Sequence, residues 1–225
     1  SSAASDVYKR QSLVVLIDEY DAPLTTVIND KLGFARVREA LSAFFALLKS
    51  NDRVIRFLFL TGITKFNKLS IFSELNNLND ISLSPRYGSL LGYTHSEVKE
   101  YFSDYLLRAS KLLGLDEMRL LDDLTKQYDG FCFEETARQK VFAPWSLLKF
   151  MAEPERGPKN YWFESGGKSS VLIQYMKTHI LSNPEDYAKT KSIALSHLSG
   201  SSDVDGLSDV GLLTQAGYLT IKNVE

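Results

Sequence analysis

The sequence predicts an α/β fold, in which a parallel sheet with flanking helices is followed by a mainly helical region. Two apolar runs, residues 12–17 and 54–60, are rich in the β-branched and aromatic side chains of strands buried in parallel sheets. Between these runs, residues 32–50 carry apolar side chains at the spacing of one helix face. A strand, an amphipathic helix and a second strand in this order predict a βαβ unit.

Helix-start signals define the region after the second strand. Thr94 followed by Glu97 predicts a capping box at the start of a helix. Residues 116–128 are expected to form another helix, and Pro144 is expected to start a third over 145–151. Further along the chain we expect a short hairpin of residues 131–133 with 141–142, a linker at 154–158, two helical pieces within 160–198, and a helix that turns into a strand within 210–221. This order predicts a core domain over 12–150 and a helical accessory region over 151–225.

Composition excludes several classes of protein. The 225 residues are 44% hydrophobic and 24% charged, which is typical of a globular chain. The 26 basic and 28 acidic residues give a net charge of −2, which does not indicate a strongly basic nucleic-acid-binding protein. No apolar run approaches the roughly 18–20 residues that cross a bilayer. The single cysteine, Cys132, and the lack of a secretory signal indicate a cytoplasmic location.

The first eleven residues, SSAASDVYKRQ, resemble the in-frame translation of a transposase adapter used in sequencing libraries. They also lack the apolar centre of a signal peptide. We therefore expect the natural part of this sequence to start near Ser12. In the natural protein, other residues are expected to precede Ser12 in place of the adapter. The alternative is that residues 1–11 are native, which genomic sequence reading through the junction would establish.

Two adjacent acids follow the first predicted strand. Ligands of parallel sheets bind beyond the carboxyl ends of the strands, where Asp18 and Glu19 are expected. Nucleoside triphosphate hydrolysis needs a carboxylate there for Mg²⁺ and a group that orients the attacking water. This pattern predicts Asp18 as the metal ligand and Glu19 as the catalytic base. The alternative is a solvated acidic turn that has no chemical role.

Polar residues near the second strand extend this candidate site. Thr61 ends the strand and is expected to meet the γ-phosphate or the attacking water, although a hydroxyl that only caps a turn is the alternative. Lys65, Lys68 and Arg86 are the candidate phosphate contacts, against the alternative of surface charges.

The phosphate-binding loop that such a site requires does not occur in this chain. The pattern G-x-x-x-x-G-K-S/T is absent, so this loop is expected to precede Ser12. Residues 166–169 read Gly-Gly-Lys-Ser, but they lack the first glycine and follow no buried strand. We interpret this segment as a loop that enters a helix.

Several motifs in order resemble those of the predicted AAA-ATPase-like family, which is widespread in bacteria. They lie at residues 14–24, 59–66, 70–78, 128–131, 144–147, 161–166 and 213–219. The resemblance implies the C-terminal part of a P-loop NTPase core over 12–150, followed by a helical region with a candidate winged helix. It also implies that Asp18 and Glu19 are the magnesium and catalytic acids and that Thr61 is the sensor residue. Many members continue into a nuclease-like domain of the PD-(D/E)xK type.

The function expected from the residues and the resemblance is ATP binding and hydrolysis with Mg²⁺ by the intact protein. The reaction would drive a conformational change in an attached nuclease-like domain or another partner. Without a phosphate-binding loop, this chain alone is not expected to hydrolyse ATP. The alternative is a non-catalytic module that binds protein or nucleic acid and keeps a degenerate nucleotide site.

Overall fold

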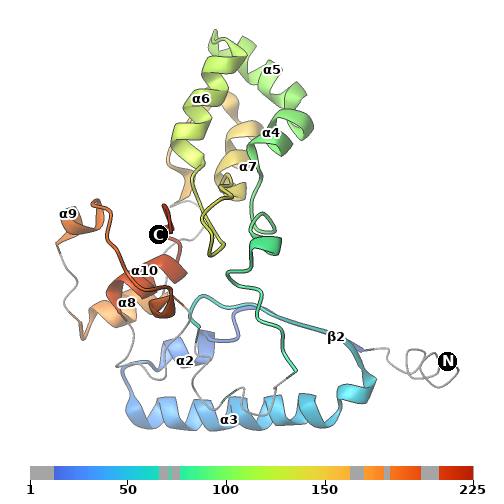
Figure 1. Cartoon of the computed structure of the whole chain (residues 1–225), viewed down its shortest axis with the longest axis vertical. Helices are drawn as coiled ribbons and strands as arrows, with labels where there is room; N and C mark the ends of the chain where they lie inside the picture. Colours follow the sequence, from blue (N-terminus) through green and yellow to red (C-terminus); the bar gives the residue numbers. More distant parts are fainter. Residues whose placement is uncertain are drawn as a thin grey trace, which may run out of the picture. The chain divides into compact units, whose positions relative to one another are not determined.

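The computed structural model describes residues 13–65, 71, 77–162, 170–179, 183–198 and 208–224. The chain forms two compact units, each built from separate stretches of sequence (Figure 1). The first unit draws on Ser1–Leu78 and Ser169–Leu219, and the second on Asn79–Lys168 and Thr220–Glu225. The domain boundary at residue 150 stays a prediction, and the compact units follow a different division of the chain.

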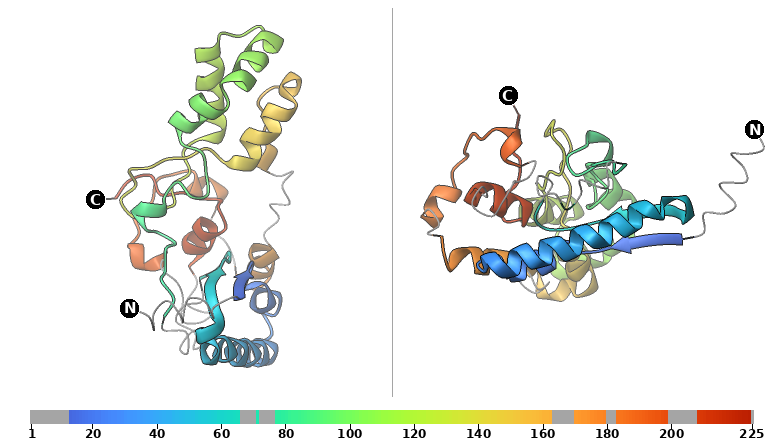
Figure 2. Two further views of the ribbon diagram at one scale, coloured as in Figure 1. Left: turned by 90° about the vertical axis from the view of Figure 1, so that its right-hand side faces the viewer. Right: turned by 90° about the horizontal axis from the view of Figure 1, so that it is seen from below.

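The first unit contains the expected βαβ arrangement, which confirms the α/β class. Strands β1 (Leu13–Ile17) and β2 (Ile55–Leu60) pair in parallel, with Ile17 opposite Leu60 at their carboxyl ends. Helix α3 (Lys31–Ser50) connects them and runs along the strand pair (Figures 1 and 2). Asp30 caps α3 by accepting a hydrogen bond of 3.1 Å from the backbone NH of Leu32. A 3₁₀ turn, η1 (Asp52–Val54), leads from α3 into β2.

The burial of β1 differs from the expectation. We predicted a strand buried on both faces, but Val14 and Leu16 are 51% and 68% exposed, and Phe57 on β2 is 53% exposed. Ile17, on the opposite face of β1, packs against the core of the unit. The physical reason is that the described residues form a sheet of only two strands, of which one face is covered by helix.

The core of the first unit joins helices from both ends of the chain. Helices α2 (Ala22–Thr26) and α8 (Ser170–Met176) contact each other, and Asn29 donates a hydrogen bond of 2.7 Å to the carbonyl of Gln174. The unit also contains α9 (Pro184–Tyr187), η6 (Leu195–His197) and α10 (Asp209–Gln215). Its buried core residues are Leu24, Ile28, Phe34, Phe45, Ile71, Tyr175 and Leu212. Helices that the sequence assigned to the accessory region therefore share a core with the strands.

The second unit is mainly helical and confirms the predicted helices. It contains η3 (Pro85–Tyr87), α4 (His95–Tyr101), α5 (Ser103–Leu113), α6 (Glu117–Tyr128), α7 (Pro144–Ala152) and η4 (Pro154–Arg156). Phe131 and Val141 form an antiparallel bridge, as the expected hairpin requires, and Tyr93 pairs with Phe142 beside it. The described residues do not confirm a winged helix. None of their helices is both long and apolar enough to span a bilayer.

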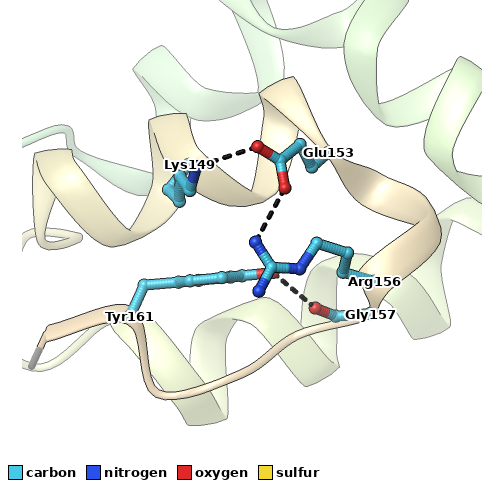
Figure 3. Close-up of polar contacts among 5 residues, drawn as sticks. All are labelled: Lys149, Glu153, Arg156, Gly157 and Tyr161. Atoms are coloured by element: carbon cyan, nitrogen blue, oxygen red, sulfur yellow. Dashed lines mark hydrogen bonds and ion pairs between the residues drawn. The ribbon is translucent and has the colours of Figure 1, made fainter. Parts of the chain in front are cut away.

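Polar contacts fix the end of α7 in the second unit (Figure 3). Glu153 accepts hydrogen bonds from Lys149 at 2.8 Å and from Arg156 at 2.7 Å. These bonds, first that from Lys149 and then that from Arg156, lower the pKa of Glu153 to about 2. The Tyr161 hydroxyl donates to the carbonyl of Gly157 at 3.1 Å, and the Arg156 guanidinium lies 5.9 Å from the centre of the Tyr161 ring. The turn after α7 is thereby tied to the buried Tyr161.

The capping box at the start of α4 is confirmed. Glu97 NH donates to the Thr94 hydroxyl at 3.3 Å, and Thr94 NH donates to the Glu97 carboxylate at 2.8 Å. The hydrogen bonds from the backbone and the hydroxyl of Thr94 lower the pKa of Glu97.

Loss of this cap should be measurable in the stability of the second unit. Thr94→Ala should lower the free energy of unfolding by about 1 kcal/mol, because the NH of Glu97 loses its acceptor, the Thr94 hydroxyl. Thr94→Ser keeps the hydroxyl and is the matched control. Urea unfolding followed by tryptophan fluorescence measures the change, since both tryptophans, Trp145 and Trp162, lie in this unit. Equal stability of the two variants would contradict the role of the cap.

Candidate functional site

The ends of the two strands bring Asp18 and Thr61 together. Asp18 follows β1 and Thr61 follows β2, so the register that pairs Ile17 with Leu60 places them side by side. The Thr61 hydroxyl donates a hydrogen bond to the Asp18 carboxylate. The backbone joins the same corner, because Thr61 NH donates to the carbonyl of Ile17 at 2.8 Å and Tyr20 NH donates to that of Thr61 at 2.9 Å. Two of the predicted site residues, distant in sequence, are therefore in direct contact.

Glu19 lies in an unusual backbone conformation beside this pair. Its φ angle is +51°, in the left-handed region that costs a residue other than glycine on the order of 1 kcal/mol. Its NH donates to the Asp18 carboxylate at 3.0 Å, and its carbonyl accepts from Ala22 NH at 2.9 Å in the turn into α2. The side chain of Glu19 is exposed. A strained position that presents an exposed carboxylate is typical of functional sites.

Asp21 is a site residue to which the sequence analysis gave no role. It is 2% exposed, and its carboxylate accepts hydrogen bonds from Ile63 NH at 3.1 Å and from Thr64 NH at 2.6 Å. Tyr20 adds a hydrogen bond of 2.9 Å from its hydroxyl to the Thr64 carbonyl. The turn after β1 is thus bound to the segment after β2. The only sequence signal was a third acid within four residues, which a solvated turn would also carry.

Gly62 allows the two turns to approach closely. A Cβ atom at this position would lie 2.6 Å from a carbon of the Tyr20 ring and 2.7 Å from an oxygen of the Asp21 carboxylate. A larger residue would therefore displace one of these side chains. Thr64 is buried beside them, and its hydroxyl has no hydrogen-bond partner among the described residues.

The predicted basic residues do not all belong to the unit that contains Asp18 and Thr61. Lys65 lies four residues after Thr61, and its backbone NH donates to the side-chain oxygen of Gln215 on α10 at 3.2 Å. Arg86 belongs to the second unit, in η3, where its guanidinium lies 5.7 Å from the centre of the Tyr87 ring. Lys68 and the Gly-Gly-Lys-Ser segment at 166–169 lie outside the described residues, as does the adapter-like segment 1–11. Phosphate contact by these basic residues stays a prediction.

The oxygen atoms at the strand ends suit Mg²⁺. A carboxylate from Asp18 and a hydroxyl from Thr61 are hard donors, which Mg²⁺ prefers. No group of three or more His, Cys, Asp or Glu side chains in the described part of the chain could hold a metal ion. Magnesium that accompanies a nucleotide commonly takes one or two protein carboxylates and completes its shell with phosphates and water. Asp18 and Thr61 could supply part of such a shell.

The segment that carries this corner is similar to a known protein family. Residues 2–72 match the model of the predicted AAA-ATPase family. This range contains Asp18, Glu19, Thr61 and Lys65, and it confirms the family resemblance of the motifs in this part of the chain. The AAA-ATPase match begins within residues 1–11, whose assignment as adapter sequence stays a prediction.

Similarity to another protein continues beyond residue 72 and covers nearly the whole chain. The "Uncharacterized protein in vnfD 5'region" of Azotobacter chroococcum mcd 1 is 34% identical over 215 residues. The alignment covers 96% of this chain and 38% of the relative, so the chain spans about two fifths of the relative's length. No solved structure matches the chain.

Proposed function

We propose that the intact protein binds and hydrolyses ATP with Mg²⁺ at the corner formed by Asp18, Glu19 and Thr61. The observation that supports this most is the hydrogen bond between Thr61 and Asp18 at the carboxyl ends of two parallel strands. Ligands of open α/β sheets bind at this edge. The match of the same segment to a family of predicted ATPases agrees with this location.

Each residue has a distinct role in this proposal. Asp18 would hold Mg²⁺, which supplies neutralisation of charge on the transferred phosphoryl group. Glu19, exposed at the rim, would orient the attacking water and accept its proton. The Thr61 hydroxyl, which is hydrogen-bonded to Asp18, would contact the γ-phosphate or the attacking water, as a sensor residue does. Lys65 would contact phosphate oxygens.

The hydrolysis cycle is proposed to change the conformation of a partner or an attached nuclease-like domain, in the cytoplasm. The parts of the protein that this chain does not include would contribute the phosphate-binding loop and that domain. The chain by itself is therefore expected to show no turnover.

The test is phosphate release by the intact protein with and without Mg²⁺. Asp18→Asn should raise the Mg²⁺ concentration needed for half-maximal rate by roughly tenfold or more, because an amide binds the cation more weakly than a carboxylate. Asp52→Asn, an exposed acid of the same unit, is the matched control. Equal Mg²⁺ dependence of the two variants would contradict the metal role of Asp18. An intact protein that neither binds nor hydrolyses ATP would instead support the non-catalytic interaction module.

A further inference from the structure

We propose that Asp21 is a positioning residue, which holds the segment after β2 so that Thr61 stays against Asp18. The inference rests on the proposed function, because it assigns Asp21 to the same nucleotide site. Asp21 itself is buried away from the rim and is not expected to touch the nucleotide.

The first argument is where the Asp21 carboxylate directs its hydrogen bonds. Asp21 occupies the N-cap position of α2, where an aspartate normally accepts a hydrogen bond from its own helix. Here the side chain makes no capping hydrogen bond. It accepts instead from the NH groups of Ile63 and Thr64, 42 and 43 residues along the chain. The Asp21 side chain therefore connects the two strand ends and does not cap α2.

The second argument is the strength and direction of this connection. Hydrogen bonds from backbone NH groups to a carboxylate are charge-assisted and stronger than neutral ones, and burial increases the cost of losing them. The two donors lie two and three residues after Thr61. The carbonyl of the second one, Thr64, also accepts a hydrogen bond from the Tyr20 hydroxyl. With both turns tied together, the position of Thr61 relative to Asp18 is fixed before any ligand binds.

The decisive variant is Asp21→Asn in the intact protein. The amide keeps one acceptor oxygen but turns an NH₂ group toward the second backbone donor, so one of the two bonds is lost. We expect kcat for ATP hydrolysis to fall by about tenfold or more while KM for Mg–ATP changes less than about threefold. We also expect the amide hydrogens of Ile63 and Thr64 to exchange at least about tenfold faster, with those in the middle of α3 unchanged. Exchange that accelerates throughout the unit would show that the variant has lost its structure, and a second pair of variants then decides the question.

A pair of glycine variants tests the same contact without removing the carboxylate. Gly62→Ala pushes a methyl group into Asp21 and Tyr20. Gly33→Ala places one 2.5 Å from the carboxylate of Asp30, the N-cap of α3, and so disturbs the same unit at a contact that does not involve Asp21. Gly62→Ala should reproduce the fall in kcat, and Gly33→Ala should match the wild type. This pair decides the question if Asp21→Asn does not fold.

The outcomes separate this inference from the proposed function. If the wild type hydrolyses no ATP, the proposed ATPase function is refuted. Faster exchange at Ile63 and Thr64 in Asp21→Asn would still support the connection made by Asp21. Wild-type kcat and unchanged exchange in both Asp21→Asn and Gly62→Ala would overturn the inference and leave the ATPase standing.

Discussion

Glu19→Gln should lower ATP turnover by the intact protein about 100-fold or more and leave ATP binding within about threefold of the wild type. Glutamine keeps the size and the hydrogen-bonding reach of glutamate but cannot accept a proton from water. Steady-state phosphate release measures turnover, and titration with a fluorescent ATP analogue measures binding. Glu39→Gln, an exposed acid on α3, is the matched control. Turnover that stays at the wild-type level would remove Glu19 from the catalytic machinery.

The backbone conformation of Glu19 provides an independent check of this assignment. Glu19 and Ala137 have nearly the same left-handed φ angles, +51° and +54°. Glycine adopts this region without steric cost but loses more chain entropy on folding, so Glu19→Gly and Ala137→Gly should each change stability by less than about 1 kcal/mol. Only Glu19→Gly should abolish turnover. A loss of turnover in both variants would show that the effect is not specific to the carboxylate.

The second large effect is expected in the other unit, at Glu134. This side chain is 1% exposed, and its two carboxylate oxygens accept hydrogen bonds from the NH groups of Thr136, Arg138 and Gln139 and from the Thr136 hydroxyl. Burial by itself raises the pKa of Glu134, but these hydrogen bonds outweigh it and lower the pKa from 4.5 to about 2. Glu134 is therefore ionised and fully satisfied at neutral pH.

Glu134→Gln should lower the free energy of unfolding by about 3 kcal/mol at pH 7. With the amide nitrogen at the position of Oε2, the NH of Thr136 loses its acceptor, and with it at the position of Oε1, the NH groups of Arg138 and Gln139 lose theirs. Urea unfolding followed by fluorescence of Trp145 and Trp162 measures the loss. Glu135→Gln, at the exposed neighbouring position, is the control and should be within about 0.5 kcal/mol of the wild type.

The pH dependence of the same measurement gives the sign of the Glu134 contribution. Because the folded pKa lies below the ordinary value of 4.5, the folded state favours the ionised form. The stabilisation is complete above about pH 4.5 and is lost as the pH falls toward 2. The difference between the wild type and Glu134→Gln should shrink over that window. A difference that stays constant down to pH 2 would contradict the assigned hydrogen bonds.

The sequence predicted the local elements of the fold and assigned Asp18 and Thr61 to one candidate site, but it did not predict their direct contact. The βαβ unit was predictable because strand and helix periodicities are local, and the cap at Thr94 because it needs only residues three apart. The meeting of Asp18 and Thr61 follows from the parallel pairing of β1 and β2, which aligns their carboxyl ends. The metal, base and phosphate roles of the site residues stay predictions.

Features that depend on distant packing were not predictable in the same way. An apolar strand pattern indicates that a strand can be buried, but it does not say what covers it, and so β1 was expected to be buried on both faces. The partners of Asp21 are backbone groups more than 40 residues away, which carry no side-chain pattern. The periodicity of α8 and α10 marks an apolar face, but it does not reveal that this face shares a core with α2 and α3.

The uncovered face of the strand pair has a practical consequence for every experiment on this protein. This face exposes hydrophobic side chains to water, namely those of Val14, Leu16 and Phe57, and such surfaces favour association. Two strands whose backbone edges have no neighbour in the described part of the chain are also a template for β-aggregation. At high protein concentration the isolated chain is therefore expected to form oligomers or precipitate, so the unfolding measurements need dilute protein. Nucleotide titrations on it would then measure a heterogeneous suspension.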